Sequence, residues 1–299
     1  MKLKFATTIA LLACVLILTP RGASAKEWRG IVPLHSTRAD VEKLLGPEVD
    51  EGLGYDIEGE RVTINYGSHK CEEDLPGGWN VPPNTVIEIR LSSNKGLTMA
   101  DFPVHWQALD QIYSVHTPQI DYLDAAEGVR YTTVDGLVRV ITYIGSAEDE
   151  KKFSCGAYKY AAPVPEGVKL TRFEQYPFDS YGKIPFEDAK ARLDTFVIQL
   201  LETIKARPNS RGFILVYAGR SAHDAEARTF AEGAKNYLVK VRQADPDSII
   251  AVDAGYQDEF RVELYILPND AYPPLLKPTV SPKKVQIVPG EFNPCPEQR

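Results

Sequence analysis

The side chains that could form a catalytic or metal site are scattered along this chain. The histidines lie far apart, at His35, His69, His105, His116 and His223. No His-x-x-x-His pair and no Cys-x-x-Cys motif occurs, and the closest potential ligands are His69 and Cys71, two residues apart. No Gly-x-Ser-x-Gly elbow, phosphate-binding loop or dinucleotide fingerprint is present. We therefore predict no catalytic residue, no metal and no cofactor, and we expect a protein that is not an enzyme.

The cysteines indicate disulfide chemistry in an oxidising compartment. Cys14 lies in an N-terminal apolar run, which leaves Cys71, Cys155 and Cys295 in the rest of the chain. The simplest pairing joins Cys71 to Cys155, a bridge worth ~4 kcal/mol on the chain-entropy account of disulfides. Cys295 would then be free or paired with another chain. The alternative is a Cys71–Cys295 bridge that pins the C-terminal tail.

The elements that could position a site are most regular between residues 170 and 268. From Glu187 to Lys205, apolar residues recur at steps of three and four, which predicts an amphipathic helix. Its expected inner face is Leu193, Phe196, Val197, Leu200, Leu201 and Ile204. Residues 211–219 follow as a run of strand-forming residues, which predicts a buried central strand.

A second helix and two strands are predicted downstream of that central strand. Ser221, followed three residues later by Asp224, is typical of a helix start. Residues 249–252 predict the next strand, and residues 260–267 alternate as a half-buried strand does. With a weaker strand at Thr171–Tyr176, the order is βαβαββ. We predict an α+β sandwich with both helices on one face of the sheet.

This element order resembles the OmpA-like periplasmic domain over about a third of the chain. The residues that carry the resemblance are Phe178-Asp-Ser180, Asn236-Tyr-Leu238 and Arg261–Ile266. The resemblance implies binding of peptidoglycan, in which a loop aspartate holds the ammonium of diaminopimelate and a helix arginine holds its carboxylate. Residues 170–268 are therefore interpreted as an OmpA-like domain with an altered ligand motif.

The positions that the resemblance assigns to the ligand carry other residues here. Arg220 or Ser221 occupies the place of the family aspartate, and Phe230 the place of the family arginine. Asp224 and Arg228 are near enough to replace them. A structural role also stays open for both, with Asp224 as a helix cap and Arg228 as a solvated surface residue.

Residues 26–156 predict a second α+β unit, a helix followed by an antiparallel meander. The helix follows Ser36, directs Val41, Leu44 and Leu45 inward and ends at Gly46-Pro47. Strands are predicted at 61–66, 85–91, 129–133 and 137–144, the last two joined by an Asp-Gly turn. The helix and its Leu-Gly-Pro end resemble SmpA/OmlA (BamE) and β-lactamase-inhibitor-like modules, which implies binding of other proteins.

The N-terminal residues predict export, and the proline-rich segments further along predict a linker and a spacer. Residues 1–25 combine Lys2 and Lys4, the apolar run Phe5–Leu18 and Ala23-Ser-Ala25, which is typical of a signal peptide cleaved after Ala25. A lipid anchor at Cys14 is the alternative. Residues 157–169 predict a proline-rich linker, and residues 269–299 a proline-rich tail, either a flexible spacer, which we favour, or a partner's ligand.

The net charge of the chain indicates which classes of partner it repels. The formal net charge is −7, and it becomes −10 without residues 1–25, which contain three basic and no acidic residues. Such a chain repels nucleic-acid phosphates and anionic lipids, so we expect neither as a partner. No apolar run reaches the ~20 residues that a membrane-spanning helix needs. We expect a periplasmic or extracellular protein that binds peptidoglycan or, as the alternative, envelope proteins alone. An unrecognised envelope hydrolase is the least favoured alternative.

Overall fold

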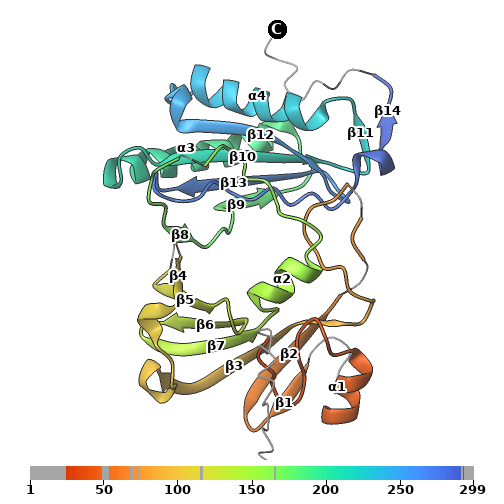
Figure 1. The fold of residues 1–299 in the computed structure, drawn as a ribbon. Helices are drawn as coiled ribbons and strands as arrows, with labels where there is room; N and C mark the ends of the chain where they lie inside the picture. Colours follow the sequence, from red (N-terminus) through yellow and green to blue (C-terminus); the bar gives the residue numbers. More distant parts are fainter. Residues whose placement is uncertain are drawn as a thin grey trace, which may run out of the picture.

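The computed structural model describes residues 25–48, 54–67, 70–72, 74–114, 117–164, 166–290 and 292. The expected signal peptide up to residue 24, together with Cys14, His69, His116 and Cys295, lies outside these residues. The described chain forms two large β-sheets, the first mainly from its first half and the second from its second half, and a small two-stranded sheet, with helices α1 to α4 around them (Figure 1). The predicted α+β class is confirmed.

The first sheet has eight strands in the order β1-β2-β3-β7-β6-β5-β4-β8. Their bounds are Tyr55–Ile57 (β1), Glu60–Tyr66 (β2), Val86–Thr98 (β3), Asp110–Tyr113 (β4), Gln119–Asp124 (β5), Val129–Val134 (β6), Leu137–Tyr143 (β7) and Arg172–Phe173 (β8). All neighbours are antiparallel except β4 and β8. The predicted helix and antiparallel strands are present, but the sheet is not a simple meander, because β3 lies beside β7. Strands β1, β4 and β5 were not predicted.

Two helices accompany this sheet, α1 (Arg38–Leu45) and α2 (Ala147–Phe153). Helix α1 is capped by Thr37, and Val41 is its one fully buried residue. The prediction that Leu44 points inward is wrong, because Leu44 is 51% exposed. The short helix contacts the sheet along the narrow stripe of Val41 and Leu45, one turn apart, and Leu44 lies beside that stripe.

The second sheet has four strands in the order β12-β10-β13-β9, with helices on one face (Figure 1). The elements are β9 (Asp179–Tyr181), α3 (Phe186–Ala206), β10 (Arg211–Ala218), α4 (Glu226–Lys240), β12 (Ile249–Tyr256) and β13 (Arg261–Leu267). Strands β10 and β12 are parallel, and the other pairs are antiparallel. The predicted βαβαββ order with helices on one face is confirmed.

The first strand of that order is not the predicted one. Residues 171–176 contain β8, which pairs with β4 of the first sheet, and β9 takes the edge of the second sheet instead. The prediction placed the strand a few residues too early because the apolar residues on both sides of Pro177 give similar strand signals. Within α3, Leu201 is 43% exposed and does not belong to the inner face.

The second sheet is buried on both faces. Opposite the helices, Leu215, Tyr217, Tyr265 and Leu267 pack in a cluster of their own. Ala161 and Ala162 of the predicted linker, and Ala271 and Leu276 of the predicted tail, cover that cluster. The prediction that residues 260–267 are half buried is therefore wrong. The tail also differs from the predicted flexible spacer. A flexible spacer would leave its side chains exposed, whereas residues 271–281 include several buried side chains.

The tail continues along the second sheet as regular structure. Pro282–Lys284 forms a 3-10 helix (η4), and Gln286–Val288 forms β14, which pairs in parallel with β11 (Ser221–His223). Figure 1 shows this pair at the end of the second sheet, beside the start of α4. Three more 3-10 helices span Met99–Asp101 (η1), Trp106–Ala108 (η2) and Pro246–Ser248 (η3).

Cys71 and Cys155 form a disulfide, as predicted, with Cα atoms 5.2 Å apart and a sequence separation of 84. The alternative Cys71–Cys295 pairing is thereby excluded. Backbone hydrogen bonds support the bridge, from Gly77 N–H to Gly156 O (3.1 Å) and from Cys155 N–H to Gly78 O (3.1 Å). We call residues 70–80 the disulfide loop; the structure describes all of them except residue 73.

Candidate functional site

The start of α4 holds three of the four predicted ligand residues, in a different arrangement from the predicted one. Ser221 belongs to β11, and the helix begins at Glu226 after Ala225, whose φ is 53°. Ser221 therefore does not cap the helix, because it lies in β11, four residues before the N-cap residue Ala225. Asp224 and Arg228 are exposed, and neither makes a hydrogen bond or ion pair with any described residue. The helix-cap role considered for Asp224 is not what the structure shows.

Glu226 is the acid that serves the helix start, and sequence reasoning missed it. Its side chain is 2% exposed, accepts the backbone N–H of His223 (2.9 Å) and pairs with the Lys183 ammonium (3.0 Å). A carboxylate in the first turn also interacts favourably with the helix dipole. Nothing in the sequence distinguishes Glu226 from the exposed acids nearby, because Lys183 lies 43 residues away.

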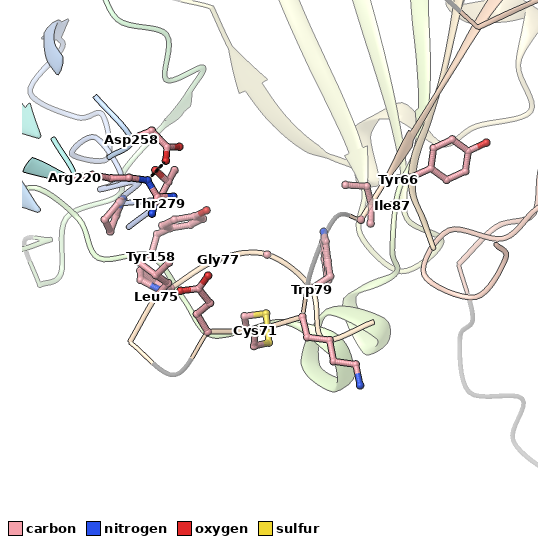
Figure 2. A pocket seen from close by; sticks show the side chains of 17 residues that line it. Tyr66, Cys71, Leu75, Gly77, Trp79, Ile87, Tyr158, Arg220, Asp258 and Thr279 are labelled. Carbon is pink, nitrogen blue, oxygen red and sulfur yellow. Dashed lines mark hydrogen bonds and ion pairs between the residues drawn. A yellow bond between two sulfur atoms is a disulfide. The ribbon is translucent and has the colours of Figure 1, made fainter. Parts of the chain in front are cut away.

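Arg220, the fourth predicted residue, lies in a different place. It lines a cavity of about 560 Å³ between the disulfide loop and the end of the second sheet (Figure 2). Its Nε donates to Oδ1 of Asp258 at 2.6 Å, and its backbone N–H donates to the Asp258 carbonyl. The two side chains are 57% and 66% exposed. Arg220 thus belongs to a surface ion pair at the rim of a cavity.

The opposite side of the cavity comes from the first half of the chain. Figure 2 shows Trp79 and Ile87 across the cavity from Arg220 and Asp258, with Tyr158 close to the charged pair. Gly77 has a φ of 82°, and a Cβ there would lie 1.9 Å from Cζ of Tyr158. The Tyr158 ring therefore packs directly on the backbone of the disulfide loop, and only glycine allows this approach.

The disulfide loop is also joined to the tail. Glu72 pairs with Lys284 at 2.7 Å and Asp74 with Lys283 at 2.8 Å, and Ser281 Oγ donates to Asp74 at 3.2 Å. The hydrogen bond from Lys283 is the main cause that lowers the pKa of Asp74. These contacts hold η4 against the loop and complete the rim of the cavity near Thr279.

A histidine, an aspartate and a serine meet elsewhere, at the start of α2. His35 Nε2 lies 2.8 Å from Oδ1 of Asp149, and Ser146 Oγ donates to Oδ2 at 2.7 Å. Burial of Asp149 favours its neutral form, but the bonds from Ser146, His35 and the Ala25 N–H outweigh burial and lower its pKa. The serine hydroxyl donates to the aspartate and not to the histidine, which differs from a Ser-His-Asp relay. The group caps α2 and anchors the chain at Ala25.

Two further observations concern the described residues only. They contain no group of three or more His, Cys, Asp or Glu residues arranged to hold a metal ion, and Cys71 is oxidised and not available as a ligand. They also contain no helix with the length and apolar character needed to cross a membrane. The disulfide indicates a non-cytoplasmic environment.

Comparison of the chain with protein-family models, with curated proteins and with solved structures finds no match. The arguments that follow therefore rest on the residues and geometry described above.

Proposed function

We propose that this chain is a non-catalytic, exported protein of the bacterial cell envelope that binds peptidoglycan through the start of α4. The observation that carries the proposal is the pair of exposed charges at Asp224 and Arg228, neither of which has a described partner. A carboxylate and a guanidinium four residues apart match a ligand that has both an ammonium and a carboxylate. Diaminopimelate of peptidoglycan has both groups.

The other two predicted residues do not take part in this proposal. Arg220 is engaged with Asp258, and the Ser221 backbone is paired with β14. The tail covers part of the space in front of α4 and so limits how a ligand can reach the helix. Phe292 stacks on His223 with ring centroids 5.9 Å apart, and Lys183 Nζ lies 5.6 Å from the centre of the Phe292 ring. The ligand would therefore approach from the solvent side of Asp224 and Arg228.

Cosedimentation with isolated peptidoglycan sacculi tests the proposal. We expect residues 26–299 to pellet with sacculi and free diaminopimelate to compete. Asp224→Ala and Arg228→Ala should each reduce the bound fraction about tenfold, because each removes a charge-assisted hydrogen bond. Matched controls are Asp188→Ala and Arg207→Ala, which remove an exposed acid and an exposed arginine near the two ends of α3.

The proposal fails if the Asp224 and Arg228 variants pellet as well as the unaltered protein, or if the control variants lose binding to the same extent.

A second candidate function is binding of another envelope protein by the free edge of the second sheet. Strand β12 pairs only with β10 among the described strands, so the outer backbone groups in its middle, around Val252, are open to a partner strand. At its two ends the carbonyls of Ile249 and Tyr256 already accept hydrogen bonds, from Lys235 and from the tail. A photocrosslinking residue at Val252 should then capture a protein that copurifies with the intact chain. A photocrosslinking residue at Glu202, on the outer face of α3, is the control. If it captured the same protein at the same level, the β12 edge would not be the binding site.

A further inference from the structure

The cavity between the disulfide loop and the second sheet is lined by four charged side chains, Lys70, Glu72, Arg220 and Asp258, and by apolar ones that include Trp79 and Ile87. We call the part formed by Arg220 and Asp258 its charged end. Figure 2 shows Arg220 and Asp258 at one end, with Trp79 and Ile87 at the other. Its volume of about 560 Å³ lies within the range of about 300–1,000 Å³ that is typical of small-molecule sites. The site is separate from Asp224 and Arg228, which do not line it.

The charged end keeps binding capacity that the ion pair does not use. Arg220 uses its Nε for Asp258, and no described residue accepts a hydrogen bond from its two terminal amino groups. Asp258 uses Oδ1, and no described side chain donates to its Oδ2. A guanidinium presents two parallel N–H groups to a carboxylate, and a carboxylate oxygen accepts from an ammonium.

From this geometry we propose that the cavity binds a short peptide or an amino acid that has a free ammonium, a free carboxylate and an apolar side chain. The ligand carboxylate lies on the terminal amino groups of Arg220, and its ammonium on Oδ2 of Asp258. The side chain extends toward Trp79 and Ile87. An exposed ion pair is worth at most about 1 kcal/mol, so Arg220 and Asp258 rearrange around a ligand at little cost.

The walls of the cavity are held in place before any ligand arrives. The Cys71–Cys155 bridge lines the cavity, and Tyr158 packs on Gly77 beside it. On the tail side, Glu72 and Asp74 pair with Lys284 and Lys283. A prearranged site loses less conformational freedom on binding, which favours affinity for small ligands.

Calorimetric titration of residues 26–299 with the dipeptide Ala-Phe tests the proposal. We expect saturable binding, and we expect acetylation of its amine or amidation of its carboxylate to weaken binding about tenfold. Arg220→Gln should weaken binding of Ala-Phe but change little for the amide, which no longer has the carboxylate. In the same way, Asp258→Asn should weaken binding of Ala-Phe more than binding of the acetylated peptide, which no longer has the ammonium.

Arg207→Gln is the matched control, because Arg207 is also an exposed arginine of the second half of the chain but does not line the cavity. It should leave Ala-Phe binding unchanged. Ala-Phe should also change the fluorescence of Trp79, and Trp79→Phe should remove that change. Absence of saturable binding at millimolar Ala-Phe, or equal effects of Arg220→Gln and Arg207→Gln, would overturn the proposal. Either result leaves the sacculus experiment unaffected.

Discussion

The two sheets of this chain are buried in different ways. In β6 of the first sheet, buried Val129, Tyr131 and Thr133 alternate with half-exposed residues. In β10 and β13 of the second sheet, residues are buried on both faces. Strand β6 therefore has one buried and one half-exposed face, whereas β10 and β13 resemble strands of the fully covered sheets of α/β proteins. The cover on the second face comes from segments that are distant in sequence.

Polar side chains under that cover satisfy one another. Tyr265 donates its hydroxyl to Glu263 at 2.9 Å, and Glu263 also pairs with Arg261 at 3.0 Å. The hydroxyl of Tyr217 accepts the backbone N–H of Lys277 from the tail at 3.1 Å, and burial raises the pKa of Tyr217 to about 12. Alternating polar residues in a strand thus do not by themselves indicate an open face.

The largest effect on stability is expected in the second sheet. It tests whether the face of that sheet opposite the helices is a true hydrophobic core. Leu215 faces the linker and tail, and Leu264 faces the helices, and both are fully buried. We expect Leu215→Ala and Leu264→Ala each to reduce the free energy of unfolding by about 2–5 kcal/mol, measured by urea denaturation. Leu44→Ala, at a half-exposed leucine, is the control and should cost much less. A cost at Leu215 no greater than at Leu44 would mean that the cover is loose.

A smaller effect is expected at Asp149, the buried acid beside the first sheet. Asp149→Asn should destabilise the protein by about 1–3 kcal/mol at neutral pH, because it weakens hydrogen bonds to a charged group. The pKa of Asp149 is lowered in the folded protein, so its contribution is complete above the ordinary value of about 3.9. It is lost as the pH falls further, through the lowered folded pKa.

Urea denaturation of both proteins at pH 7, 5 and 3 measures this dependence. The difference in free energy of unfolding between the unaltered protein and Asp149→Asn should be constant from pH 7 to 5 and should become smaller at pH 3. A difference that does not depend on pH would contradict the role assigned to the Asp149 charge.

The smallest effect is expected where the tail meets the disulfide loop. Lys284→Ala removes an exposed ion pair with Glu72, so the free energy of unfolding should change by less than about 1 kcal/mol. Locally, amide hydrogen exchange in β11 should become faster, because η4 leads directly into the β14 partner strand. Unchanged exchange in β11 would show that the loop contact does not help to hold the tail.

Much of the second sheet could be predicted because its signals are local. The stripe of α3 lies within 21 residues, and β10 is a continuous apolar run between helices. The partner of β8 could not be predicted, because two short strands pair across about 60 residues without a marked pattern. The packed tail was missed for a similar reason. Proline prevents regular structure but does not prevent packing on a ready-made sheet.

The candidate site was predictable only in part. Arg220 could be singled out from the loop that follows β10, but its partner Asp258 lies 38 residues away. Trp79, Tyr158 and the tail come from segments that only the folded chain brings together. The disulfide was the one long-range contact that the sequence indicated, because so few cysteines left few choices.

The contacts between the disulfide loop and the tail also set an order of events for folding. Asp74 and Glu72 meet partners that follow them by 207 and 212 residues, close to the end of the chain. A growing chain can close the disulfide once residue 155 is available, yet the second face of the second sheet stays uncovered until residues 271–288 arrive. Contacts over such separations form late, since loop closure must precede them. We therefore expect the chain to be most vulnerable to aggregation and proteolysis in the interval before residues 271–288 emerge.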